Sequence, residues 1–207
     1  MTAAEILHIL QQNIHSVVFA TADEEGLPYT CVIDLMLADE DGLYFLTARG
    51  KSFYDRLTAR PFVALSGIKG KDTLSAAAIS VRGTVQNIGK ERLDEIFEKN
   101  PYMAKIYPTA KSRDALEVFR LGKGEGEYFD LSCQPPFRQS FSLGGEAIRE
   151  TGYRIDPDRC IGCQGCRSVC PSGCISRTVP RVIDENHCLH CGSCFRICPV
   201  KAVEKLG

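Results

Sequence analysis

The fold of the C-terminal part is decided by two runs, Cys160-Ile161-Gly162-Cys163-Gln164-Gly165-Cys166-Arg167-Ser168-Val169-Cys170-Pro171 and Cys188-Leu189-His190-Cys191-Gly192-Ser193-Cys194-Phe195-Arg196-Ile197-Cys198-Pro199. Both have the spacing C-x2-C-x2-C-x3-C-P, and the second begins 28 residues after the first. The repeat extends upstream, because Ile155-Asp156 precedes Cys160 by the interval at which Ile183-Asp184 precedes Cys188. We therefore expect a short strand before each loop. In this register Cys174 falls opposite Ala202, so we expect its side chain to pack rather than to act as a ligand.

Residues from about 153 to 203 resemble a bacterial two-4Fe-4S ferredoxin domain, which is a small α+β fold. The resemblance implies that Cys160, Cys163, Cys166 and Cys198 hold one cluster, and that Cys188, Cys191, Cys194 and Cys170 hold the other. Three thiolates at short intervals wrap a loop around one cubane. The fourth lies beyond the reach of that loop and is donated to the neighbouring cluster, so the clusters tie the two halves together.

Three other uses of cysteine fit the sequence less well. Zinc sites usually show two paired ligands, a long gap and two more, rather than two runs of four that end in Cys-Pro. Disulfide frameworks suit small secreted domains, whereas this chain has 207 residues and begins with no apolar signal segment. A c-type haem requires Cys-x-x-Cys-His, which is absent. Thiolate ligands without a secretion signal predict a reducing cytoplasm and suggest an anaerobe.

Length and charge limit the remaining possibilities. A cluster domain of about fifty residues leaves enough chain for a second domain with its own core. No run approaches the roughly 18 apolar residues of a membrane span, so we expect no membrane partner. Residues 151–207 carry eight Lys or Arg against five Asp or Glu, but two oxidised clusters with their thiolates add about four negative charges. The basic residues therefore compensate the clusters, and we expect no nucleic-acid partner.

The N-terminal part begins with a capping box, Thr2-Ala3-Ala4-Glu5, before an amphipathic helix. Alternating patterns and turn residues then predict an antiparallel meander of three strands, followed by a helix that starts at Ser52 and further strands and helices. The predicted meander strands are 17–21, 28–37 and 43–47. Later strands are expected over 62–68, 75–87, 116–121 and 127–132, with helices near 93–97 and 102–107.

Two glycine-containing segments connect or follow these elements. Gly122-Lys123-Gly124-Glu125-Gly126 lacks the order of a phosphate-binding loop and has no helix after it, so it predicts a hairpin turn. Residues 133–150 contain Pro135-Pro136 and Gly144-Gly145, and they predict an irregular linker or a tail on the barrel. The expected domains are therefore 1–132 and 151–207, joined by this linker.

The first domain is similar to the split β-barrel of the pyridoxamine 5'-phosphate oxidase-like flavoproteins. The resemblance covers roughly residues 5–132 and rests on the order of elements and on three stretches, Gly26–Thr30, Gly42–Thr47 and Lys51–Leu65. It implies a mainly β barrel with flanking helices that binds FMN at the interface of a homodimer. The chain departs from the oxidase proper at Asp34 and Leu35, where a basic residue is expected, so pyridoxamine phosphate is not the expected substrate.

In this family the FMN phosphate is held at the end of the third strand and the start of the next helix. The corresponding residues are Thr47, Arg49, Lys51 and Ser52. Two cations, two hydroxyls and the free N–H groups of a helix start all favour a phosphate. Thr30 and Cys31, on the preceding strand, are expected to face either the isoalloxazine edge of the flavin or its phosphate. Arg138 is better explained as a surface arginine than as a flavin contact, and the four histidines show no metal-binding or catalytic spacing.

Three hypotheses follow. The first is an FMN-dependent iron–sulfur oxidoreductase that works in the reductase direction, with a soluble electron donor and a small-molecule substrate. The second is an electron-transfer module without a substrate, which exchanges electrons with a soluble donor or acceptor. The third is a redox sensor whose barrel holds haem, a deazaflavin or nothing. No nucleophile–base–acid constellation is visible, so the sequence assigns no catalytic side chain and no substrate.

Overall fold

The structure, a computed structural model, describes residues 1–207 and divides them into two compact units. The first unit comprises residues 1–69, 78–128 and 140–147, and the second comprises 70–77, 129–139 and 148–207. Every helix is too short or too polar to span a bilayer.

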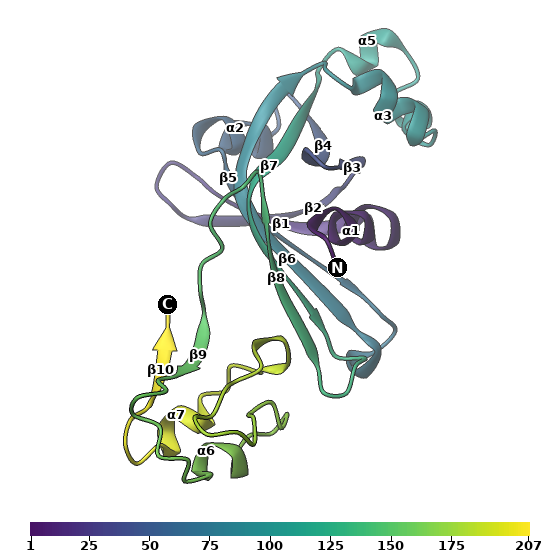
Figure 1. Ribbon diagram of the computed structural model, residues 1–207. Coiled ribbons are helices and arrows are strands. Elements are labelled where there is room, and N and C mark those ends of the chain that lie inside the picture. The colour runs from purple at the N-terminus through teal and green to yellow at the C-terminus, as the bar shows by residue number, and fades with distance from the viewer. The chain divides into compact units, whose positions relative to one another are not determined.

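The first unit contains most of an eight-stranded sheet (Figure 1). The strands are β1 (Ser16–Ala22), β2 (Pro28–Asp34), β3 (Leu37–Asp39), β4 (Gly42–Ala48), β5 (Phe62–Lys69), β6 (Ala77–Gly89), β7 (Leu116–Asp130) and β8 (Phe137–Leu143). The helices of this unit are α1 (Ala3–His8), the π-helix η1 (Ile9–Ile14), α2 (Ser52–Ala59), α3 (Leu93–Lys99), α4 (Met103–Ile106) and α5 (Ala110–Arg113), whereas the 3-10 turn η2 (Thr73–Ser75) belongs to the second unit. Helix α5 was not predicted.

The strand order is β2-β1-β5-β6-β7-β4-β3, with β8 paired to β7. The strands pair antiparallel where β1 meets β2 and β5, and where β4 meets β3 and β7. The expected three-strand meander is wrong, because β2 and β3 lie at opposite ends of this order. Leu35 and Met36 are buried at the break between them, and their N–H groups bond to the carbonyls of His15 and Tyr44. These two residues end what the alternation alone predicts as one long strand.

The expected hairpin at residues 122–126 is also wrong, because these residues lie inside the continuous strand β7. Its glycines serve close packing instead of a turn. A Cβ on Gly124, where φ is +157°, would lie 2.2 Å from the carbonyl oxygen of Arg82 on β6. A Cβ on Gly126 would lie 2.4 Å from the ring of Phe141 on β8. Close neighbours on both sides therefore exclude side chains here, and the same pairing makes residues 137–143 of the predicted irregular linker a strand.

Aromatic side chains fill the barrel interior. Phe19 packs on Phe45 with ring centroids 4.7 Å apart, and Phe45 stacks on Phe119 at 5.8 Å. All three rings are fully buried, and Phe53 of α2 joins them. Because Phe53 is anchored in this core, the N-terminal end of α2 is held at a fixed place beside the end of β4.

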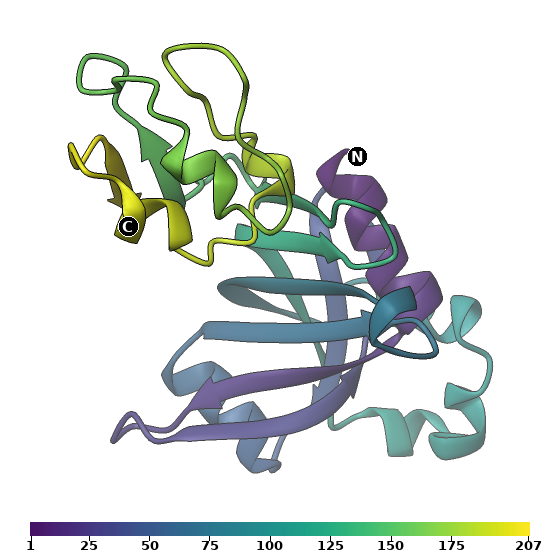
Figure 2. The same cartoon turned by 90° about the horizontal axis from the view of Figure 1, so that it is seen from below.

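The helix at the N-terminus forms as the capping box predicts. Thr2 Oγ1 accepts a hydrogen bond from the Glu5 N–H at 3.2 Å, and Glu5 accepts one from the Thr2 N–H at 2.7 Å. Ile6, Leu7 and Leu10 form a buried stripe on this helical segment. The segment lies beside the sheet (Figure 2), where α1 contacts β3 and β4 and η1 contacts β1 and β5.

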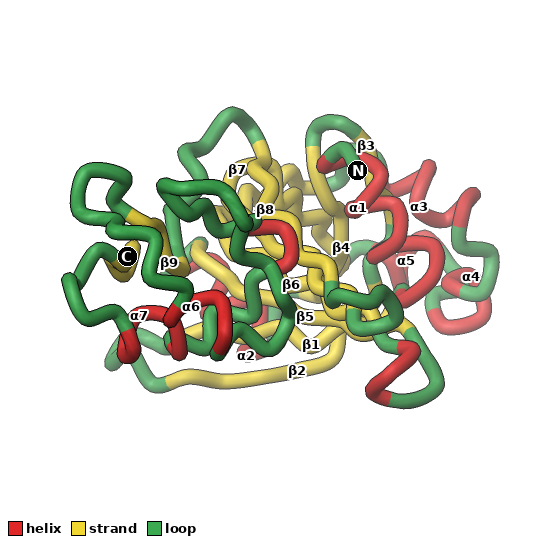
Figure 3. Tube along the Cα trace, turned by 60° about the horizontal axis from the view of Figure 1, so that its bottom comes forward, coloured by secondary structure: helices red, strands yellow, loops and turns green.

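The second unit contains mainly loops around short helices and strands (Figure 3). Its elements are β9 (Gly152–Ile155), α6 (Gly165–Ser168), η3 (Glu185–His187), α7 (Ser193–Ile197) and β10 (Val203–Leu206). β9 pairs antiparallel with β10, and an isolated bridge joins Ile175 to Ile183. The left-handed backbone also repeats, because Gln164 and Gly192, at equivalent positions, have φ values of +68° and +71°. The strand expected before the first run therefore forms, whereas only the bridge forms before the second.

Candidate functional site

One pocket of the second unit gathers four cysteines from both runs. Cys160, Cys163 and Cys166 come from the first run, and Cys198 comes from the end of the second. Arg181 lies at the same pocket, and its backbone N–H donates to Cys160 Sγ at 3.5 Å. These are the four thiols that the resemblance to a two-cluster ferredoxin assigns to one cluster. The structure therefore brings together one complete predicted ligand set.

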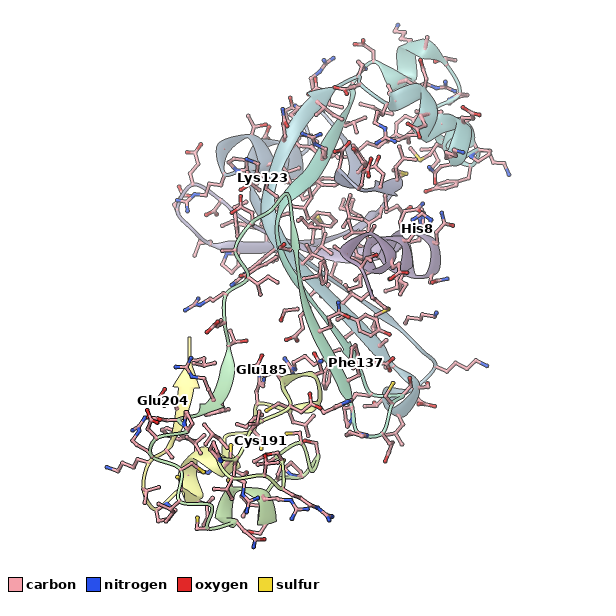
Figure 4. The ribbon with its side chains drawn as sticks, viewed as in Figure 1. His8, Lys123, Phe137, Glu185, Cys191 and Glu204 are labelled. Carbon is pink, nitrogen blue, oxygen red and sulfur yellow. The ribbon has the colours of Figure 1, made fainter.

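A second pocket gathers the complementary set. Cys188, Cys191 and Cys194 of the second run meet Cys170 of the first, and Cys191 is labelled in Figure 4. The backbone N–H of His190 donates to Cys188 Sγ at 3.4 Å. Hydrogen bonds from the Ser193 side chain and backbone lower the pKa of Cys191, which favours a thiolate there.

Cys174 lies in the second pocket as a fifth cysteine. Its Sγ is 3.5 Å from Cys170 Sγ. Burial raises the pKa of Cys174 to about 12. Burial also acts to raise the pKa of Cys170, but hydrogen bonds from Ser172 and Cys174 bring it below its ordinary value. The directions fit a Cys170 thiolate that accepts a hydrogen bond from a protonated Cys174 thiol.

The charge around the first pocket fits an anionic cluster. The Arg181 side chain is 6% exposed, and its Nε lacks a hydrogen-bond partner. Its other donors meet only backbone carbonyls, so no carboxylate balances its charge. A buried cation without a counter-ion is costly. Four thiolates on an iron–sulfur core would supply the missing negative charge.

A single-ion site is not formed. No three His, Cys, Asp or Glu side chains converge closely enough to hold one metal ion. Thiolates around a four-iron cube are held apart by the cube itself, and each pocket contains one predicted group of four cysteines.

A second candidate site lies in the first unit at the start of α2. Lys51 is the N-cap residue, with a φ of −92° and no side-chain hydrogen bond to the helix. Ser52 is the first helical residue, so the helix starts where the sequence predicts. Both side chains are exposed. Uncapped N–H groups at a helix start, together with a lysine and a serine, form a donor set that suits a phosphate.

The other two predicted phosphate contacts are less available. Arg49 forms ion pairs with Glu117 at 3.1 Å and with Asp114 at 3.2 Å. Thr47 is only 4% exposed. Arg49 is therefore already neutralised by two carboxylates, whereas Lys51 and Ser52 remain accessible. These two carboxylates lie 68 and 65 residues from Arg49 in the chain, so the sequence around Arg49 did not indicate the ion pairs.

Thr30 and Cys31 lie on opposite faces of β2, because successive residues of a strand alternate. Thr30 is paired with Ala20 on the exposed face, and Cys31 is paired with the buried Phe19. One ligand on one face cannot meet both side chains. Burial raises the pKa of Cys31, and the nearby cations Arg56 and Lys51 act against this rise.

Arg56 is a further cation of α2 that was not predicted from the sequence. Its Nε donates to Thr21 Oγ1 at 2.8 Å, and its guanidinium lies 4.7 Å from the centre of the Tyr29 ring. It stands four residues after Ser52, which is one helical turn, and this spacing was the signal that could have identified it. Arg56 lies in the last turn of α2, and it and Lys51 are the two cations that act on the pKa of Cys31.

The remaining candidates lie in the second unit. Arg138 stacks its guanidinium over the Phe129 ring at 4.8 Å, so it is a packed rather than a free surface residue. His187 Nδ1 lies 3.1 Å from the carbonyl oxygen of Pro136, and its ring meets Phe137 edge-on. These contacts explain how the segment 129–139 is held within this unit.

Comparison with known proteins agrees with this architecture. Residues 3–127 match the family described as "Pyridoxamine 5'-phosphate oxidase", and residues 153–176 and 181–204 each match a "4Fe-4S binding domain". A NimC/NimA family protein from Clostridium acetobutylicum has a TM-score of 0.56 at 20% identity, and the match covers 68% of this chain and 92% of that one.

Two further solved structures share the fold. A heme binding protein from Mycobacterium smegmatis has a TM-score of 0.54 at 15% identity, with 69% of this chain and 58% of that one covered. ChuZ from Campylobacter jejuni has a TM-score of 0.52 at 10% identity, with 70% and 65% covered. At these identities the likeness shows the fold alone. The predicted split barrel and the two cluster domains are confirmed.

Proposed function

The chain belongs to the pyridoxamine 5'-phosphate oxidase family and also carries two 4Fe-4S domains, and on this basis we propose that it is an iron–sulfur flavoprotein oxidoreductase. Such a combination is typical of a redox protein, because a flavin stores two electrons yet accepts them singly. The observation that carries the proposal is the pair of pockets in which each run supplies three cysteines and lends its fourth to the other.

In this proposal Cys160, Cys163, Cys166 and Cys198 hold one cluster, and Cys188, Cys191, Cys194 and Cys170 hold the other. The uncompensated charge of Arg181 supports the first assignment. The depressed pKa of Cys191 supports the second. When bound, each cluster supplies one-electron transfer, and the protein's part is to fix the thiolates and their hydrogen-bond donors.

FMN is the proposed occupant of the barrel, with its phosphate at Lys51 and Ser52. The exposed, uncapped start of α2 supports this choice, and Arg56 is a second cation close by. Arg49 and Thr47 are not favoured as direct contacts, because one is ion-paired and the other is buried.

A homodimer is proposed as the assembled form. The outer face of β1, β2 and β5 carries Val18, Val32, Phe62 and Ile68, which are 44%, 65%, 57% and 66% exposed. Val18 and Val32 are cross-strand neighbours, and Phe62 and Ile68 lie on the same face of the neighbouring strand β5. Apolar surface of this kind on one sheet face supports association with a second copy.

The dimer is tested by placing a charge on this face. Sedimentation equilibrium of the purified protein is expected to give about twice the chain mass of 22.8 kDa. Val32→Glu buries an unpaired carboxylate at the interface, so we expect its mass to fall toward that of one chain. Leu74→Glu, at a 78% exposed residue of the second unit, is the control and should keep the dimer mass. An unchanged Val32→Glu dimer would exclude this face.

Anaerobic purification followed by cofactor analysis tests the proposed function directly. We expect about eight irons and eight labile sulfides per chain, because each cluster contributes four of each. We also expect FMN in the extract and a flavin absorption spectrum. Iron settling near four per chain, or zinc in its place, contradicts the assignment of two clusters.

The second candidate function is a redox sensor with haem in the barrel. The observation in its favour is the fold shared with a heme binding protein. The same spectrum separates the two candidates, since haem gives an intense Soret band and flavin does not. An empty barrel with full iron content favours an electron-transfer module without a substrate of its own.

A further inference from the structure

The two cysteine pockets are related by the internal repeat but differ in charge at one pair of equivalent lining positions. Residues that line the first pocket have counterparts 28 residues away that line the second, as Ile155 and Ile183 do. At the equivalent pair, Arg181 lines the first pocket and Tyr153 lines the second. One pocket therefore has a permanent positive charge where the other has a neutral phenol.

The Arg181 guanidinium is fixed in place and shielded from water. It is 6% exposed, and Nη2 donates to the carbonyl of Gly162 at 3.1 Å, inside the first cysteine loop. Nη1 donates to the carbonyls of Ser176, Arg177 and Thr178. These oxygens orient the cation without neutralising it. Nε remains without a partner.

We infer that Arg181 gives the cluster held by Cys160, Cys163, Cys166 and Cys198 the higher reduction potential of the two, so that the first electron rests there. This inference relies on the proposed cluster sites. One electron from a soluble donor increases the negative charge of that site by one, and no bond forms or breaks. A nearby buried cation stabilises the extra charge, and net charge, hydrogen bonds and exposure are what set such potentials.

The second pocket has donors of its own, but they are weaker. Arg196 contacts the Cys191 carbonyl at 3.4 Å, yet it is exposed and therefore screened by water and salt. Cys174 and Ser172 approach Cys170 Sγ at 3.5 and 3.7 Å, and both are neutral. A full charge in a dry environment outweighs these contacts, so the asymmetry favours the first pocket.

The test is an EPR-monitored potentiometric titration of the anaerobically purified full chain, with dithionite as reductant. Arg181→Gln removes the charge and keeps a donor. We expect this variant to lower the reduction potential of the first cluster, the higher of the two, by at least about 59 mV, which is a tenfold change in the equilibrium constant of a one-electron couple. The potential of the second cluster should not change. Arg181→Lys keeps the charge and should stay close to wild type. A shift of the lower potential, or equal shifts of both, overturns the inference.

Arg196→Gln is the matched control, because it removes the same charge from an exposed position, and it should move neither potential. Iron analysis of each variant separates two kinds of failure. A wild-type protein without two clusters refutes the proposed function, whereas full iron with an unmoved higher potential in Arg181→Gln refutes only the inference. If Arg181→Gln loses iron, the Tyr153→Arg variant is the deciding test. It places a cation at the second pocket and should raise the lower of the two reduction potentials. A Tyr153→Arg protein with full iron content and an unchanged lower potential overturns the inference.

Discussion

Cys170→Ala is expected to lower the iron content from about eight to about four per chain, because it removes the fourth ligand of one four-iron cluster only. Cys170 belongs to the first run in sequence, but it lines the pocket of Cys188, Cys191 and Cys194. The lost cluster should therefore be the one whose loop begins at Cys188. The measurement is iron and sulfide analysis of anaerobically purified protein.

The remaining cluster then reports on the first pocket alone. It should titrate at the higher of the two wild-type potentials, which ties this variant to the charge of Arg181. Cys133→Ala changes an exposed cysteine outside both pockets and should keep both clusters.

Cys174→Ala is the sharper control, because its sulfur is only 3.5 Å from Cys170 Sγ. We expect it to keep both clusters, since Ala202 serves at the equivalent position of the first pocket. Equal iron loss in Cys174→Ala and Cys170→Ala would show that our ligand assignment is wrong. If the single variant Cys170→Ala keeps eight irons, the double variant Cys170→Ala/Cys174→Ala is measured next. Iron loss in the double variant would show that Cys174 replaces Cys170 as the fourth ligand.

The C-terminal part was predictable because its information is local. The cysteine spacing carries the resemblance to a two-cluster ferredoxin, that resemblance implies which thiols meet, and the structure brings the same two groups of four together. Arg181 was not identified, although the register that pairs Ile155 with Ile183 also pairs Tyr153 with Arg181. Comparing the repeats at non-cysteine positions would have found it.

For the N-terminal part, the fold class was predictable from the sequence, but the pairing of the strands was not. Alternation correctly indicated most strands, but it does not say which strands are neighbours. The break at Leu35-Met36 depends on distant partners, His15 and Tyr44. The glycines of β7 were interpreted as a turn, because the sequence does not reveal that β6 and β8 crowd them from both sides.

The same limit applied to the phosphate site, where Arg49 and Lys51 look equivalent in sequence. The structure separates them, because Arg49 is paired with Glu117 and Asp114, whereas Lys51 is the N-cap residue of α2 and has no such partner. Lys51→Ala is therefore expected to weaken FMN binding by about 10- to 100-fold, the equivalent of a charge-assisted contact of roughly 1.5–3 kcal/mol. Fluorescence titration of the FMN-free full-length protein with FMN measures the change in affinity, and the iron content of the variant should equal that of the wild type.

Arg49→Ala is the matched control at a distance of two residues. Its charge is already balanced by carboxylates, so we expect a change in FMN affinity within about 0.5 kcal/mol, roughly twofold. The opposite order, with a large loss in Arg49→Ala and none in Lys51→Ala, would mean that FMN displaces the two carboxylates and takes Arg49 as its ligand. Equal, small effects in both would remove the phosphate from the start of α2 altogether, since neither cation of that segment would then contact it.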